Sequence, residues 1–257
     1  MHKTPSIIEE IIDPNDISSG HHITNRTLGE IVQHGIYQVQ VDQVWDHVNS
    51  KPNKYRYTPI KVCIVDTGYD VSHEDLPNNA EGTDCGYGTP MRDGDGHGTH
   101  CAGVIGALGG NNLGISGVNP GGQVRFHISK ALNDEGMGTA SSVIRGIDAC
   151  INSGARIISM SLGGGPGSKL MDGMFDRAYD KNIITFAASG NVGKDMHDYP
   201  ASYPHAVSIG GVDKSGKRAD FSNWSNQLEL MGPGKSIISC YPRNKYATLS
   251  GTSSEYS

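Results

Sequence analysis

Short apolar runs that alternate with helical patterns are the feature that most restricts the fold of this chain. Most of the runs are continuously apolar and β-branched, which is typical of strands buried on both faces. Strand–helix–strand units of this length connect parallel strands, so we expect a parallel sheet covered by helices on both sides. The predicted strands are 61–66 (KVCIVD), 124–132, 156–162, 182–190, 206–212 and 236–240.

Two stretches between these strands have the spacing of amphipathic helices, 139–155 and 168–182. Apolar residues recur about every four positions in both, which places them on one face of a helix. Gly154 is suited to end the first helix. The residues that we expect to face the sheet are Val143, Ile147, Ile151, Leu170, Met174 and Ala178.

Length and charge restrict the class of protein. The 257 residues, of which 19% are charged, suit one large packed α/β domain. The net charge of -6 argues against nucleic acid or an anionic membrane as a partner. No apolar run approaches the roughly 18 residues that a membrane-spanning helix needs. Residues 1–20 lack the charged and apolar regions of a signal peptide.

The five cysteines do not form a metal-binding pattern. Their number is odd and no C-x-x-C pair occurs, so at least one thiol stays unpaired or pairs outside the chain. Cys63 and Cys101 lie among apolar or small residues. We therefore expect both to be buried thiols that pack as small hydrophobic side chains.

Three residues of catalytic type follow predicted strands or lie in glycine-rich turns. Asp66 ends the run KVCIVD, Asn191 follows another apolar run, and Ser253 lies in the turn LSGTSS. Active sites of parallel folds lie at the carboxyl ends of the strands, where a carboxylate can orient a histidine base. A different interpretation is the D-T-G motif of an aspartic protease at Asp66. It needs two such aspartates, and this chain has one D-T-G.

The stretch RDGDGHGTHCAG (92–103) has three interpretations. As a calcium loop that begins at Asp93, it has Val104 at the position where a bidentate glutamate is needed. As a zinc site, His97 and His100 lack the glutamate of H-E-x-x-H and an evident third ligand. A histidine at the start of a buried helix suits proton transfer. The order Asp, His, Asn, Ser along the chain favours this third interpretation, with His97 as the base and the aspartates of the stretch as loop residues.

Taken together, these motifs resemble the subtilisin-like serine proteases, and look closest to the proteinase K-like and bacterial branches. The resemblance extends from about residue 30 to Ser253. It implies a three-layer α/β/α fold with a mostly parallel, roughly seven-stranded sheet. The blocks that carry it are VDTG (65–68), GHGTHCAG (96–103), SMSLGG (159–164), ASGN (188–191) and SGTS (250–253).

The resemblance also implies the catalytic roles. Ser253 would attack the peptide carbonyl, His97 would transfer the proton, and Asp66 would orient His97. Asn191 would donate its side-chain amide to the oxyanion. Polypeptides would be the substrates, with a broad, apolar side-chain preference. Two extended segments would bind the substrate strand from both sides, namely Ser161, Leu162 and Gly163 on one edge and Gly136, Met137 and Gly138 on the other.

No cofactor is implied for the chemistry, but structural calcium is. Asp75 resembles a calcium ligand of many subtilisins, and GGNNLGIS (109–116) resembles a calcium loop. Glu229, with the carbonyls of Pro204 and Ala206, resembles a second site. The further partners implied are a propeptide or a protein inhibitor, with no nucleic acid or membrane, and the protein is expected to be a monomer. A secreted or vacuolar location is expected if the full-length gene adds a signal peptide.

The two ends of the sequence depart from the family pattern. After Ser253 the chain reads SEYS, with Glu255 in place of a small alanine, so we expect a domain at 30–257 truncated before its final central helix. Residues 1–29 are interpreted as an N-terminal extension or the remnant of a propeptide. The alternative to a serine endopeptidase is therefore an inactive or fragmentary subtilisin-like domain that binds peptides or a partner protein.

Overall fold

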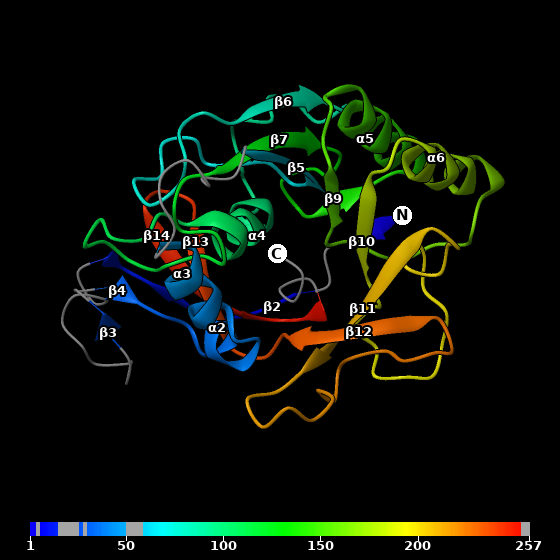
Figure 1. The fold of residues 1–257 in the computed structure, drawn as a ribbon. Coiled ribbons are helices and arrows are strands. Elements are labelled where there is room, and N and C mark those ends of the chain that lie inside the picture. The colour runs from blue at the N-terminus through cyan, green and yellow to red at the C-terminus, as the bar shows by residue number, and fades with distance from the viewer. Residues whose placement is uncertain (4–5, 15–25, 28–29, 50–58, 253–257) are drawn as a thin grey trace.

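The computed structural model describes all residues except 4–5, 15–25, 28–29, 50–58 and 253–257 (Figure 1). Its centre is a seven-stranded sheet in the order β12-β11-β10-β9-β5-β7-β6. All neighbouring strands are parallel, which confirms the predicted sheet. The strands are β5 (Ile60–Asp66), β6 (Glu81–Asp84), β7 (Val124–Lys130), β9 (Ile157–Met160), β10 (Ile184–Ala188), β11 (Ala206–Val212) and β12 (Leu228–Pro233).

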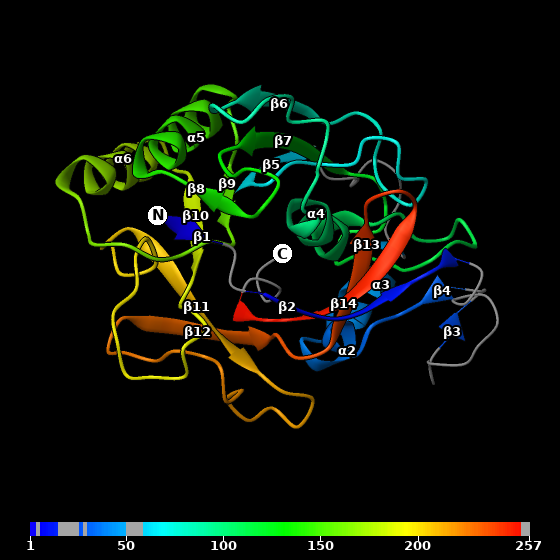
Figure 2. The same cartoon turned by 180° about the vertical axis from the view of Figure 1, so that it is seen from behind.

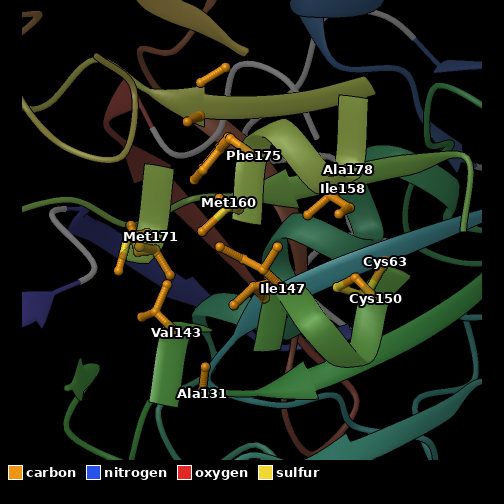
Figure 3. Packing of buried hydrophobic residues seen from close by; sticks show 14 of the residues in the cluster. Cys63, Ala131, Val143, Ile147, Cys150, Ile158, Met160, Met171, Phe175 and Ala178 are labelled. Atoms are coloured by element: carbon orange, nitrogen blue, oxygen red, sulfur yellow. A yellow bond between two sulfur atoms is a disulfide. The ribbon is translucent and has the colours of Figure 1, made fainter. Parts of the chain in front are cut away.

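Helices cover both faces of this sheet (Figures 1 and 2). On one face, α5 (Ala140–Asn152) and α6 (Lys169–Asp180) pack side by side. On the other face lies α4 (His97–Gly106). The side chains of strand β5 therefore pack against helices on both faces of the sheet. Cys63 and Val65 belong to the core cluster that contains the residues of α5 and α6, part of which is drawn in Figure 3. Val62 and Ile64 belong to the cluster beneath α4, so the strand is buried on both faces as predicted.

Local sequence explains where α5 begins and ends. Thr139 caps its first turn, because its side chain accepts from Ser142 N–H while the Ser142 side chain accepts from Thr139 N–H. Past its last residue, Gly154 has φ 76, a conformation that favours glycine. In α6 the predicted inward face is wrong at one position. Leu170 is 67% exposed, and the buried residues of this helix are Met171, Phe175 and Ala178.

A second sheet is antiparallel and lies beside α4 (Figure 2). It consists of β13 (Ile237–Tyr241), β14 (Lys245–Ser250) and β2 (Ile7–Ile12). The predicted strand 236–240 is therefore not part of the parallel sheet, because it forms a hairpin with β14. The other elements in the described part of the chain are β1 (His2–Lys3) paired with β8 (Met137–Gly138), β3 (Arg26–Thr27) paired with β4 (Glu30–Ile31), α2 (His34–Gln38) and α3 (Val41–Asn49).

A disulfide between Cys63 and Cys150 joins β5 to α5 (Figure 3). The expectation that Cys63 is a thiol is therefore wrong, although its burial is as expected. Cys85 and Cys240 are buried free thiols. Each helix in the described part of the chain is too short or too polar to cross a bilayer.

Candidate active site

Asp66 lies at the carboxyl end of β5, where chemistry is expected in a parallel sheet. Its side chain is buried, and its Oδ1 accepts from the backbone N–H of Thr67 at 2.7 Å. The Thr67 hydroxyl in turn accepts from Gly98 N–H in α4 at 2.9 Å. This bond ties the start of α4, and therefore His97, to the end of β5.

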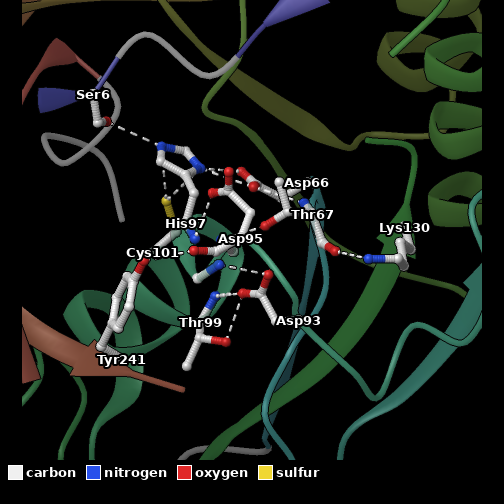
Figure 4. A network of polar contacts seen from close by, with 12 residues as sticks. Ser6, Asp66, Thr67, Asp93, Asp95, His97, Thr99, Cys101, Lys130 and Tyr241 are labelled. Carbon is white, nitrogen blue, oxygen red and sulfur yellow. Dashed lines mark hydrogen bonds and ion pairs between the residues drawn. The ribbon is translucent and has the colours of Figure 1, made fainter. Parts of the chain in front are cut away.

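His97 is the first residue of α4 and faces Asp66 (Figure 4). Its Nδ1 lies 2.8 Å from Oδ1 and 3.0 Å from Oδ2 of Asp66. Asp93 holds the turn before the helix. Its Oδ1 accepts from Gly96 N–H at 2.8 Å, and its Oδ2 accepts from Thr99 N–H at 2.9 Å. Asp93 was expected to be an ordinary loop residue, but it caps the helix that carries His97.

The electrostatic surroundings favour the protonated form of His97. Burial alone would lower its pKa, but the Asp66 carboxylate and the Cys101 sulfur raise the pKa well above the ordinary 6.5. The Cys101 Sγ lies 3.9 Å from Nδ1 of His97. A histidine held in this way has one nitrogen turned to a carboxylate and the other, Nε2, available for proton transfer.

Asn191 lies in the turn after β10, at the same edge of the sheet. Its Oδ1 accepts from the backbone N–H of Thr252 at 2.8 Å. A methyl group built on Gly251 would lie 2.7 Å from Nδ2 of Asn191, so this amide faces the segment that leads to residue 253. The predicted nucleophile, Ser253, lies outside the described residues.

The two predicted substrate-binding edges lie on either side of the N-terminal strand β1 (Figure 2). Lys3 N–H donates to Gly163 O at 3.0 Å, and Gly163 N–H donates to Lys3 O at 3.2 Å. On its other side, Lys3 pairs antiparallel with Met137, and His2 pairs with Gly138. On the first edge, Ser161 and Leu162 precede Gly163 and are buried. On the second edge, Gly136 precedes Met137 and has a φ of 70.

The N-terminal segment then reaches the imidazole of His97 (Figure 4). The Ser6 hydroxyl oxygen lies 3.1 Å from Nε2 of His97, the nitrogen that a serine nucleophile would need. Beyond Ser6, β2 pairs with β14, and Ile7 lies opposite Ser250. Sequence analysis did not identify Ser6, because nothing in a local pattern places it next to a histidine 91 residues away.

The surroundings of Asp75 fit the chemistry of a calcium ligand. Asp75 is buried, and its oxygens accept from the Asn111 side chain, Ile115 N–H and the Tyr246 hydroxyl. Burial raises the pKa of Asp75 to about 7, and the charge of Glu30 adds to the shift. Glu30 is itself buried and is bonded to the same loop, 109–116. Two buried carboxylates bonded to the same loop are suited to a hard cation with oxygen ligands.

The second predicted calcium site has weaker support. Glu229 is exposed, and its Oε2 accepts from the backbone N–H of Ser208 at 2.5 Å. Ala206 begins β11, the strand next to β12, which carries Glu229. Pro204 lies in the turn before β11. Glu229 and the Pro204 and Ala206 carbonyls therefore lie on or next to neighbouring strands, and this site stays a prediction.

The zinc interpretation of the stretch 92–103 is not supported by the position of His100. Its Nε2 lies 3.1 Å from the carbonyl oxygens of Ile237 and Ala247, and burial lowers its pKa to about 3. His100 therefore links α4 to β13 and β14. One cluster in the described part of the chain, Asp66, His97 and Cys101, has ligand atoms within 4.8 Å of one another. This cluster includes Asp66 and His97, the carboxylate–histidine pair already described.

Asn223 is a positioning residue that sequence analysis missed. Its Oδ1 accepts from the N–H groups of Val192 at 3.0 Å and Lys194 at 3.3 Å. Its Nδ2 donates to Ser189 O at 3.1 Å. These bonds hold the turn on both sides of Asn191. The residues FSNW around it give no indication of this role, which depends on a contact between separate loops.

Known proteins similar to this chain are proteases. A sequence profile described as the subtilase family (Peptidase_S8) matches residues 58–254. Subtilisin DY of Bacillus licheniformis is 38% identical over 228 residues, which are 87% of this chain and 80% of that protein. Thermitase of Thermoactinomyces vulgaris is 34% identical over 227 residues, which are 86% of this chain and 77% of thermitase. A solved structure, the psychrophilic subtilisin-like protease Apa1 from the Antarctic psychrotroph Pseudoalteromonas sp. AS-11, aligns with a TM-score of 0.73 and 35% identity over 82% of this chain and 48% of that one.

Proposed function

The chain belongs to the subtilase family of serine proteases, and from this premise we propose that it hydrolyses peptide bonds through Asp66, His97 and Ser253. The observation that carries the proposal is the contact of Nδ1 of His97 with both oxygens of Asp66, at 2.8 and 3.0 Å. A buried carboxylate in this position favours the imidazole tautomer whose Nε2 can accept a proton. Ser253 directly follows Thr252, whose backbone is bonded to Asn191.

In the proposed reaction, the Ser253 hydroxyl oxygen attacks the carbonyl carbon while Nε2 of His97 accepts the hydroxyl proton. His97 then gives this proton to the leaving amine as the peptide bond breaks. Water hydrolyses the acyl-enzyme by the same proton transfers in a second step. Asn191 and the Ser253 backbone N–H donate hydrogen bonds to the oxygen that becomes negative. These steps use only groups of the chain, the substrate and one water molecule, and they need no cofactor.

The substrates we propose are polypeptides that bind as an extended strand between two edges. One edge is formed by Ser161, Leu162 and Gly163, and the other by Gly136, Met137 and Gly138. The support is the backbone pairing of β1 with both Gly163 and β8. Backbone hydrogen bonds of this kind bind a peptide strand with little dependence on its side chains.

A fluorophosphonate probe, which phosphonylates activated serines, tests the proposed reaction. We expect covalent labelling of Ser253, identified by mass spectrometry of the digested protein. His97→Ala should slow the labelling by more than roughly 10³-fold, whereas the neighbouring Ser254→Ala should retain it. If a folded sample does not react, and the Lys3→Pro variant, which loses a hydrogen bond of β1, does not react either, the result would contradict an enzyme and favour the alternative, an inactive subtilisin-like domain that binds peptides.

We further propose that residues 1–29 are an inhibitory extension of a peptidase domain that comprises residues 30–257. Its strand β1 lies between the proposed substrate edges, and Ser6 lies against Nε2 of His97. A substrate strand and the proposed nucleophile would both need these positions. The extension is therefore expected to compete with substrates as an internal inhibitor.

Two properties outside the catalytic residues complete the proposal. Calcium bound by Asp75 and Glu30 would neutralise two buried carboxylates and stabilise the loop 109–116. The Cys63–Cys150 disulfide supports a secreted or vacuolar location, since disulfides persist in oxidising compartments.

A further inference from the structure

The carboxylate of Asp198 lies between the ends of two central strands, at the edge of the sheet that carries Asp66 and Asn191. A methyl group built on Gly163, which follows β9, would be 2.9 Å from Oδ2 of Asp198. One built on Gly190, which follows β10, would be 2.7 Å from the same oxygen. This oxygen therefore lies close to both glycines, where a side chain would collide with it. The same methyl group on Gly190 would be 2.4 Å from Nδ2 of Asn223.

The two oxygens of Asp198 have different surroundings. Oδ1 accepts from Gly164 N–H at 3.1 Å and from Tyr199 N–H at 2.9 Å, which fixes the carboxylate. For Oδ2 the described residues provide no hydrogen bond and no ion pair. Burial raises the pKa of Asp198, although the two backbone N–H groups oppose this shift. Because Asp198 is half-buried, its carboxylate is only partly hydrated, and a cationic ligand at Oδ2 would stabilise the charged form.

The position of this oxygen relative to a substrate follows from the two glycines. Gly163 is the residue that exchanges backbone hydrogen bonds with the strand bound at the edge. Gly190 directly precedes Asn191, the proposed donor to the oxyanion. The substrate residue whose carbonyl is attacked must place its oxygen within hydrogen-bonding distance of Asn191. The side chain of that residue therefore begins beside both glycines, and a long side chain can reach Oδ2 of Asp198.

We propose that Asp198 selects peptides with lysine or arginine at the residue whose carbonyl is attacked. This inference rests on the proposed function, and it replaces the apolar preference expected from the sequence. An ammonium or guanidinium group would form a charge-assisted hydrogen bond with Oδ2. An uncharged side chain of the same length, such as norleucine, would bury this oxygen without a partner.

Paired peptide nitroanilides that differ only in lysine or norleucine at this residue test the inference. We expect kcat/KM to be about 10- to 100-fold higher for the lysine substrate, the range expected for a hydrogen bond to a charged group. Asp198→Asn keeps an oxygen acceptor for Gly164 and Tyr199, so the norleucine rate should persist while the lysine preference is lost. The control Asp195→Asn removes an exposed carboxylate three residues earlier and should keep the preference.

Equal rates for the two substrates, or an unchanged preference in Asp198→Asn, would overturn the inference. Failure of both the wild-type chain and Lys3→Pro to react with a fluorophosphonate contradicts the proposed catalysis instead, and a binding measurement then decides the role of Asp198. We expect the Ser253→Ala chain to bind the lysine peptide more tightly than the norleucine peptide, and the difference to vanish when Asp198→Asn is added. Equal affinities, or no binding of either peptide, would also overturn the inference.

Discussion

At the scale of single residues, the Asp66–His97 pair determines how the proposed reaction depends on pH. His97 must be neutral to accept a proton, and Asp66 raises its pKa well above 6.5 despite burial. We therefore expect the rate of fluorophosphonate labelling to rise with pH, with a midpoint above 6.5, and to be lost as the pH falls. Asp66→Asn should lower this midpoint and reduce the rate by roughly 10⁴-fold.

Thermal unfolding at several pH values provides an independent check of the same shift. Because the folded protein raises the pKa of His97, the stabilisation is complete below the ordinary value of 6.5. It is lost as the pH rises through the pKa of the folded state. In the Asp66→Asn variant, the stability should no longer fall over this pH range. A labelling midpoint at or below 6.5 in the wild-type chain would show that Asp66 does not act on His97 in this way.

Motifs identified the residues that belong to short blocks of the sequence, and missed those that act across loops. Asp66 and His97 were found because a strand end and a helix start lie close to them in the sequence. Asp93 was taken for a loop residue, since its capping bonds depend on the turn that precedes α4. Asn223 and Asp198 act on backbone groups about 30 residues away in the chain, a distance that no local pattern reveals.

At the scale of elements, strand β1 is a two-residue strand that pairs with both of the proposed substrate edges. Lys3→Pro removes the N–H that donates to Gly163 O, whereas Lys3→Ala keeps it and changes only an exposed side chain. We expect Lys3→Pro to increase the initial rate of peptide hydrolysis by roughly 2- to 10-fold, the effect of one lost hydrogen bond. Lys3→Ala should behave like the wild-type chain.

A synthetic peptide of residues 1–12 gives a second measurement of this element. If β1 blocks the substrate edges, the peptide should inhibit the Lys3→Pro protein competitively, raising KM and leaving kcat unchanged. A Lys3→Pro variant that is no faster than Lys3→Ala would mean that β1 does not limit access of the substrate.

The elements of the core were predictable from sequence, and those at its margins were not. Strands β5, β7, β9, β10 and β11 were expected, because buried strands are continuously apolar. The edge strand β6 has the sequence EGTD, which contains nothing to bury. Leu170 was assigned to the wrong face of α6, because apolar residues at consecutive positions 170 and 171 allow two helical faces. Packing against the sheet selected Met171.

At the scale of the whole molecule, the surroundings of Asp75 join parts of the chain that are far apart in the sequence. Glu30 follows the N-terminal extension, Asn111 and Ile115 belong to one loop, and Tyr246 lies in β14. The resemblance to a family pointed to Asp75 and the loop. Glu30 could not be found from the sequence, because its buried position depends on the complete fold.

A cation that binds these carboxylates only in the folded state must stabilise the whole molecule by mass action. We expect calcium to raise the thermal unfolding midpoint, with a gain of about 2.7 kcal/mol at 100 times the dissociation constant. Asp75→Asn and Glu30→Gln should each reduce this gain, since each removes one buried carboxylate that is bonded to the loop 109–116. Glu229→Gln changes an exposed carboxylate and shows which of the two predicted sites binds calcium. If calcium stabilises Asp75→Asn as much as the wild-type chain, the cation binds elsewhere. If only Glu229→Gln loses the stabilisation by calcium, the cation binds at the second predicted site.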